Sequence, residues 1–124
     1  MQGLYRYPAN VPGSKYHSQK TVVDGITFAS KHEAQRYAEL KVLERAGEIT
    51  DLQLQRKFTL IGTQRDKEGK VIERPVTYNA YFVYKDKNGA IVVEDTKAPP
   101  TRTKDYVIKR KLMLSIYGIR VKEV

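Results

Sequence analysis

Cysteine and tryptophan are absent from the 124 residues, and histidine occurs only twice. Without cysteine there is no disulfide framework and no thiolate zinc site, and two separate histidines, His17 and His32, cannot make a histidine-rich one. Any metal ion would therefore be bound through oxygen. No apolar run reaches the roughly 18 residues that a membrane-spanning helix needs, and residues 1–7 lack the apolar core of a signal peptide. These absences predict a cytoplasmic protein with no membrane partner.

The chain is strongly basic, but its charge is unevenly distributed. Lysine and arginine number 23 against 14 acidic residues, which gives a net charge of +9. Residues 1–20 hold three bases and no acid, residues 97–124 hold eight bases and two acids, and the middle of the chain holds twelve of each. Clustered bases favour a nucleic-acid-binding surface built from the two ends, because neutralising phosphates drives non-specific affinity. A merely solubilising surface is the alternative.

Length and composition predict one domain with one hydrophobic core, preceded by an arm. Hydrophobic residues make up 40% of the chain and charged residues 30%, as in soluble globular proteins. Residues 1–20 are rich in proline and polar groups and show no periodicity, which predicts a basic N-terminal arm. We expect the folded domain to cover residues 21–124.

In the first part of that domain, the sequence predicts a hairpin followed by a helix. Asp24-Gly25 marks a turn within residues 21–28. Ser30 and Glu33 match a capping box, and the helix-favouring residues that follow predict a helix over residues 31–46. At 100° per residue, Glu33 falls at the head of the apolar stripe, so its carboxylate is expected to point toward the core.

Three strand-like runs follow, over residues 52–61, 71–84 and 90–97. The turn sequence Asn88-Gly89 between the last two runs is a strong hairpin signal, so these runs are expected to pair antiparallel. That pairing puts position 81 across from residues 94–96.

A second helix and a short strand complete the prediction. Thr101 or Thr103 caps a helix over residues 104–117, and residues 119–124 form the last strand. The helix carries one apolar stripe, made of Ile108, Leu112 and Ile116. The resulting order, α-β-β-β-α-β, predicts a small α/β fold with helices against a sheet.

The triplet (D/E)-x-K occurs three times, as Glu39-Leu40-Lys41, Glu68-Gly69-Lys70 and Asp95-Thr96-Lys97. On a helix, residues two apart point about 200° away from each other, which removes the first triplet, and the second lies in a solvated turn. In the third, a strand puts Asp95 and Lys97 on one face, where a metal-binding carboxylate and an ammonium can converge on one phosphate. A cross-strand ion pair is the simpler interpretation of these two residues, as capping is of Glu33.

Five short runs of sequence together carry a family resemblance that covers nearly everything from Lys15 to Val124. They read KYHSQKT from Lys15, SKHEA from Ser30, LQRKF from Leu54, VVEDTK from Val92 and KRKL from Lys109. In these runs the chain resembles phage and prophage proteins of the PD-(D/E)XK nuclease superfamily, the group that includes Holliday junction resolvases. The resemblance implies a PD-(D/E)XK restriction-endonuclease-like fold, with a mixed sheet flanked by helices, for a nuclease-like domain over residues 21–124. It also implies a homodimer in the host bacterial cytoplasm that hydrolyses phosphodiesters of branched or double-stranded DNA with Mg²⁺ or Mn²⁺.

The resemblance assigns roles to individual positions of the expected site. Glu33 would be the helix carboxylate, Asp95 the metal-binding acid and Lys97 the lysine that orients or polarises water, while the Thr96 carbonyl adds an oxygen to the metal. The family pattern Ala-Asp-Phe reads Ala80-Tyr81-Phe82 here, so Tyr81 stands at the position of the family's aspartate. A neutral phenol is a poor substitute for a carboxylate at a hard divalent cation.

Tyr81 leaves three explanations open: a substitution that disarms the site, a rearranged site that recruits Glu94, or a chain that only binds DNA. The leading hypothesis is a structure-selective endodeoxyribonuclease. The alternatives are a non-catalytic DNA-binding module of the same fold and, on charge alone, an RNA- or ribosome-binding protein. The nine tyrosines are interpreted as core residues, and none is assigned as a nucleophile. Bases in the arm, the first strand and the last helix are the expected DNA contacts: Lys15, His17, Lys20, Arg56, Lys57, Lys104, Lys109, Arg110 and Lys111.

Overall fold

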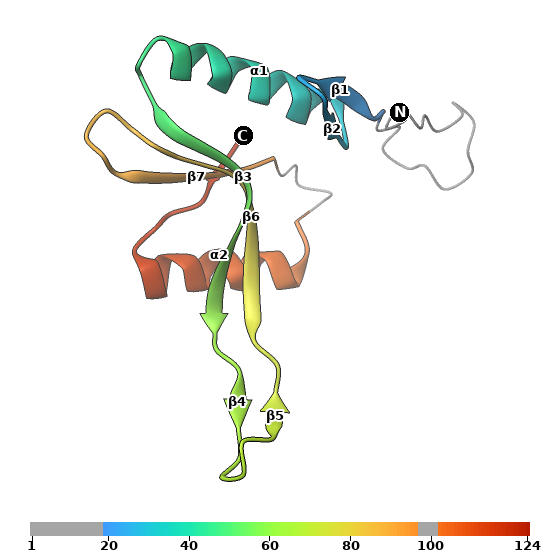
Figure 1. Ribbon diagram of the computed structural model, residues 1–124, viewed down its shortest axis with the longest axis vertical. Coiled ribbons are helices and arrows are strands. Elements are labelled where there is room, and N and C mark those ends of the chain that lie inside the picture. Colours follow the sequence, from blue (N-terminus) through green and yellow to red (C-terminus); the bar gives the residue numbers. More distant parts are fainter. Residues whose placement is uncertain (1–18, 97–101) are drawn as a thin grey trace. The chain divides into compact units, whose positions relative to one another are not determined.

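The computed structural model describes residues 19–96 and 102–124 (Figure 1). The chain has a mixed α/β architecture and forms two compact units, the first ending at Gly47 and the second running from Glu48 to Val124. Lys15, His17 and Lys97, three of the expected site residues, lie outside the described residues. So does nearly all of the predicted arm, and the domain boundaries at residues 20 and 21 stay a prediction.

The first unit begins with a short hairpin. Strand β1 (Thr21–Val23) pairs antiparallel with β2 (Ile26–Phe28). Asp24 and Gly25 form the turn with φ angles of 53° and 76°. Two consecutive positive φ angles are typical of the tight turns that match the twist of a hairpin, and Asp-Gly is a favoured pair there. The predicted turn is confirmed.

Helix α1 (Lys31–Arg45) follows the hairpin and agrees with the predicted span to within a residue. Its N-cap is Ser30, whose Oγ accepts from the Glu33 amide at 3.2 Å, as the capping box predicts. The Glu33 carboxylate reaches back over the start of the helix, where its Oε1 accepts from the Ala29 amide at 3.0 Å. The helix packs on the hairpin through Tyr37, whose ring centroid lies 5.1 Å from that of Phe28.

The second unit is built on a four-stranded mixed sheet with the order β3-β6-β7-β8. Strands β3 (Thr50–Ile61), β6 (Val76–Lys85) and β7 (Ile91–Asp95) form an antiparallel meander, and β8 (Lys122–Glu123) joins β7 in parallel. Helix α2 (Lys104–Tyr117) lies between β7 and β8 in sequence and packs against β3 and β6 (Figure 1). The predicted order and the antiparallel pairing through Asn88-Gly89 are confirmed.

One predicted strand is divided in two. The run over residues 71–84 breaks at Pro75, giving β5 (Val71–Glu73) before β6, and β5 pairs with an additional strand, β4 (Gln64–Arg65). Proline supplies no amide for a ladder hydrogen bond, and the prediction overlooked this break. The β4–β5 hairpin extends beyond the sheet and packs against no other described element (Figure 1).

The two hairpin turns of this unit have the same pattern of hydrogen bonds from backbone amides to an aspartate side chain. The Asp66 Oδ1 accepts from the amides of Glu68 and Lys70 at 3.0 and 2.9 Å. In the β6–β7 turn, the Asp86 Oδ1 accepts from the amides two and four residues later at 2.9 and 3.0 Å. In both turns the glycine three residues after the aspartate has a positive φ, 87° at Gly69 and 81° at Gly89. The side chain of aspartate therefore fixes each turn by satisfying its amides.

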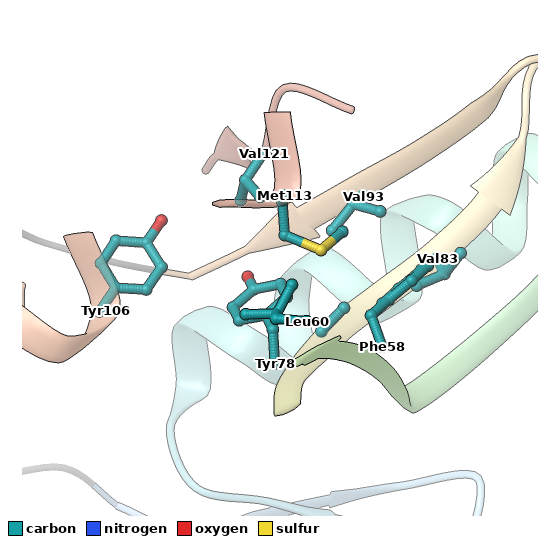
Figure 2. Packing of buried hydrophobic residues seen from close by; sticks show 9 residues of the cluster. Phe58, Leu60, Tyr78, Val83, Val93, Tyr106, Met113 and Val121 are labelled. Carbon is teal, nitrogen blue, oxygen red and sulfur yellow. The ribbon is translucent and has the colours of Figure 1, made fainter. Parts of the chain in front are cut away.

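The core of the second unit lies between α2 and the sheet (Figure 2). On the helix, Tyr106 and Met113 are buried. The predicted apolar stripe was wrong at two of its three positions: Leu112 packs against the core, but Ile108 is 55% exposed and Ile116 is 47% exposed. Ile108 lies about 200° around the helix from Tyr106, so both cannot face the sheet. The buried cluster consists of Phe58, Leu60, Tyr78, Ala80, Val83, Val93, Tyr106, Met113 and Val121.

Candidate functional site

Two buried carboxylates end strand β7. Glu94 is fully buried and Asp95 is 5% exposed. The Tyr78 hydroxyl donates to the Asp95 Oδ2 at 2.6 Å, and the Tyr84 hydroxyl donates to the Glu94 Oε2. Consecutive residues of a strand point to opposite faces, so the two carboxylates serve different sides of the sheet. The same alternation was expected from the sequence.

On the side of β7 away from β6, the neighbour of Asp95 is Glu123 of strand β8. The two residues are paired in the parallel β7–β8 register, and the Val124 amide donates to the Asp95 carbonyl at 2.9 Å. Glu123 accepts from the Tyr106 hydroxyl at 2.7 Å. Partners in a ladder share a face, so the sheet brings two carboxylates together, each held by a buried phenol.

Two guanidinium groups complete this arrangement. The Arg102 Nη2 lies 2.7 Å from the Glu123 Oε1, and the Arg110 Nη1 lies 3.0 Å from its Oε2. The Tyr78 and Tyr106 rings, 6.4 Å apart between centroids, connect the two halves; Figure 2 shows both phenol oxygens at the edge of the core. We call this set the Asp95–Glu123 network; its members are Asp95, Tyr78, Tyr106, Glu123, Arg102 and Arg110.

Burial and hydrogen bonding set the protonation of the network. Burial raises the pKa of the Tyr78 phenol, and its hydrogen bond to Asp95 raises it further. Burial and the bond to Glu123 likewise raise the pKa of Tyr106. For Glu123, burial alone would raise the pKa, but the hydrogen bonds from Tyr106, Arg110 and Arg102 outweigh it and hold the pKa below its usual value. At neutral pH both phenols are therefore protonated donors and Glu123 is a charged acceptor.

Tyr81 lies on β6, next to the end of β7. Phe82 pairs with Glu94, and continuing the register by one residue puts position 81 opposite Asp95, as the hairpin prediction requires. Tyr81 is half-buried, and its ring centroid lies 4.9 Å from that of Phe82. A phenol thus occupies the strand position next to Asp95 where the resemblance implies a carboxylate.

The other expected metal ligands are only partly placed. Thr96 directly follows β7 and is half-buried, while Lys97 lies outside the described residues. Glu33 belongs to the first unit, where its carboxylate caps the Ala29 amide. Within residues 19–96 and 102–124, no three side chains of histidine, cysteine, aspartate or glutamate are grouped as metal ligands. The second unit brings Asp95, Thr96 and Tyr81 together.

The expected DNA-binding bases differ in how they are engaged. Lys57, Lys104 and Lys111 are exposed, Lys109 is half-buried, and none of the four has an ion pair among the described residues. The Arg56 guanidinium instead lies 4.8 Å from the Phe58 ring centroid. Arg110 is bound to Glu123 and lies 5.9 Å from the Tyr106 ring. Lys20 is exposed.

A basic groove of about 550 Å³ lies between α2 and the segment that leads into β8. Its lining consists of Arg110, Lys111, Leu114, Arg120, Val121 and Glu123. Sequence reasoning missed Arg120, Glu123, Tyr78 and Tyr106 as site residues. The sequence holds one indirect signal for this network: Glu123 is one of only two acids in the basic segment of residues 97–124.

The comparisons with known proteins give a family but no further relatives. A family model described as "Protein of unknown function (DUF1064)" matches residues 13–122, which is most of the chain. Neither the curated proteins nor the solved structures include a match. Among the described residues, no helix is long and apolar enough to cross a membrane. The chain belongs to the DUF1064 family.

Proposed function

We propose that this protein binds branched DNA through a PD-(D/E)XK-type nuclease domain whose cleavage site is disarmed by Tyr81. The observation that carries the proposal is the strand connectivity of the second unit: three antiparallel strands, then α2, then β8 parallel to β7. With α1 ahead of them in sequence and the β4–β5 hairpin as an addition, these elements follow the α-β-β-β-α-β order predicted from the sequence, which is compatible with the fold that the resemblance implies. The basic residues of α2 and Arg120 supply a charge suited to phosphates.

The position of Asp95 supports the nuclease type. It ends β7 as the acid of the triplet Asp95-Thr96-Lys97, and its neighbour across the ladder is position 81. Two carboxylates at these positions would face each other across one strand pair and could share a divalent cation. In this chain the second of them is Tyr81.

The described residues do not make a complete set of ligands for Mg²⁺ or Mn²⁺. Three carboxylates lie at the end of β7, but Glu94 accepts from Tyr84 and Glu123 is bound by two arginines. The remaining one is Asp95, whose Oδ2 accepts from Tyr78. Hard divalent cations prefer several oxygen ligands and favour carboxylates. Recruitment of Glu94 is disfavoured, because Glu94 points to the other face and is bound to Tyr84. We therefore propose DNA binding by the wild-type protein, with cleavage restored by a carboxylate at position 81.

A second candidate, a module that binds DNA and has no cleavage chemistry to restore, is favoured by one observation. The Tyr78 hydroxyl fixes the buried Asp95 within the core network, which is also what a purely structural aspartate requires. The two candidates predict the same DNA binding and differ in the response to a carboxylate at position 81.

The test is cleavage of a labelled four-way junction by the wild type and by Tyr81→Asp, in Mg²⁺, in Mn²⁺ and in chelator. Tyr81→Asn is the matched control, since it has nearly the same size as aspartate and no charge. We expect metal-dependent nicking from Tyr81→Asp only. Binding without nicking by all three proteins would support the second candidate, and nicking by the wild type would show that the site tolerates Tyr81. Absence of junction binding in all three would refute both candidates.

A homodimer is part of the proposal, because symmetric cleavage of a four-way junction needs two sites related by a two-fold axis. Light scattering of the protein with and without junction DNA measures the number of chains. A single chain on the junction would contradict the dimer while leaving DNA binding in place.

A further inference from the structure

We infer that the groove between α2 and the Arg120–Glu123 segment is the surface that holds a DNA backbone. This inference rests on the proposed function and deepens it by naming the binding surface. The groove has a volume of about 550 Å³, and three cations, Arg110, Lys111 and Arg120, line it together with one carboxylate. The carboxylate is Glu123, which Arg102 and Arg110 neutralise at 2.7 and 3.0 Å.

One of the three cations is held in place by other side chains, and the other two are exposed to solvent. Arg110 is held by Glu123 and by the Tyr106 ring at 5.9 Å, so its guanidinium has a defined position in the groove wall. Lys111 and Arg120 are exposed and have no carboxylate within ion-pair distance among residues 19–96 and 102–124. A fixed guanidinium orients an incoming phosphate, and two solvated cations bind it without first breaking an internal ion pair.

The charge continues along the helix in a line, which favours a chain of phosphates over a single anion. Lys104 lies seven residues before Lys111, so the two share a face about 10 Å apart along the axis of α2. On the strand side, Lys122 is exposed two residues after Arg120. A mononucleotide or free phosphate would use only part of such a row, whereas a nucleic-acid strand presents phosphates at regular intervals.

The apolar part of the groove suits the sugars between those phosphates. Leu114 is 51% exposed, although it lies on a helix with a buried face, and it lines the groove beside the cations. Glu123, in the groove wall, is the β-ladder partner of Asp95. A strand bound here would therefore pass the end of β7 that carries Asp95, which connects the binding surface to the candidate cleavage site.

The opposite flank of α2 serves as the comparison within the same helix. It carries the exposed Ile108 and Ile116 and a smaller cavity of about 420 Å³ that Pro75, Val76 and Leu112 help to line. That flank has one lysine, Lys109, and one acid, Asp105, so it lacks the excess of positive charge that a polyanion needs. The basic flank is the one suited to DNA.

The experiment measures junction and duplex DNA binding by fluorescence anisotropy across a series of salt concentrations. The test protein is the double variant Lys111→Ala/Arg120→Ala. Its matched control is Lys67→Ala/Lys70→Ala, which removes the same charge from exposed positions of the β4–β5 hairpin. Circular dichroism melts establish that each variant is folded.

We expect the groove variant to bind at least about tenfold more weakly, and the slope of log K against log salt to fall by about 0.9 per lost phosphate contact. The control should keep the wild-type affinity and slope. Wild-type affinity in the groove variant, or an equal loss in the control, would overturn the groove while the proposed function stands. Failure of the wild type to bind any DNA would overturn the proposed function itself, and tighter binding of an RNA duplex through Lys111 and Arg120 would reassign the groove to RNA.

Discussion

Asp95 and Glu123 lie side by side in the β7–β8 ladder, yet their surroundings differ. Glu123 accepts from a phenol and from two guanidinium groups, so two positive charges face its one negative charge. Asp95 accepts from the neutral phenol of Tyr78 and is next to position 81 on the other side. From this comparison we propose that Glu123 holds α2 and β8 in place, whereas Asp95 is the carboxylate of the candidate cleavage site.

The largest expected difference between Glu123 and Asp95 is in how much the contacts of each acid contribute to the free energy of unfolding. Glu123→Ala leaves the Tyr106 hydroxyl and two guanidinium groups without their acceptor, and we expect a loss of about 2–3 kcal/mol in the free energy of unfolding. The loss stays below that of a fully buried ion pair, because both arginines are partly exposed and can be rehydrated. Urea unfolding followed by circular dichroism measures it.

The matched variant for Asp95 is Tyr78→Phe. It removes the hydroxyl that donates to Asp95 and leaves the aromatic ring in the core. Its expected cost is smaller, about 1 kcal/mol, because one hydrogen bond is lost and no ion pair is broken. A Tyr78→Phe loss equal to or larger than that of Glu123→Ala would contradict the division between a structural and a functional acid.

A smaller effect is expected on the pH dependence of stability. The pKa of Glu123 is lower in the folded protein than its ordinary value of 4.5, so the folded state binds this proton more weakly than the unfolded chain. The charged carboxylate therefore stabilises the fold at neutral pH, and this contribution is lost as the pH falls below 4.5 through the folded pKa. We expect the unfolding free energy of the wild type to fall more steeply in this range than that of Glu123→Gln. Parallel curves for the two proteins would show that Glu123 is not stabilised by its charge.

Local signals were enough to predict most of the elements. Ser30 caps α1 and Gly118, with φ 69°, ends α2, and each acts through backbone groups within a few residues of itself. The β6–β7 turn is likewise specified by Asp86, Asn88 and Gly89 alone. Such contacts can be recognised in a sequence because both partners lie in the same short segment.

The network and the groove could not be predicted in the same way. Tyr78 and Asp95 are 17 residues apart, as are Tyr106 and Glu123. The first pair joins β6 to β7 and the second joins α2 to β8, and the two pairs become one network because β8 pairs with β7. The apolar stripe on α2 was wrong at Ile108 and Ile116 for a related reason. The buried Tyr106 has a hydroxyl that donates to Glu123, a distant partner that hydrophobicity alone does not reveal. Arg120 became a candidate only when the β8 segment was seen to form a groove with α2.

The most direct test of the difference between the two acids is junction cleavage in the Tyr81→Asp background. Adding Asp95→Asn removes the proposed metal-binding carboxylate, whereas adding Glu123→Gln removes the proposed structural charge and keeps the shape of the side chain. At a temperature where both double variants are folded, we predict that Asp95→Asn abolishes nicking and that Glu123→Gln retains it. Persistent nicking with Asp95→Asn, or loss of nicking in a folded Glu123→Gln protein, would contradict the account.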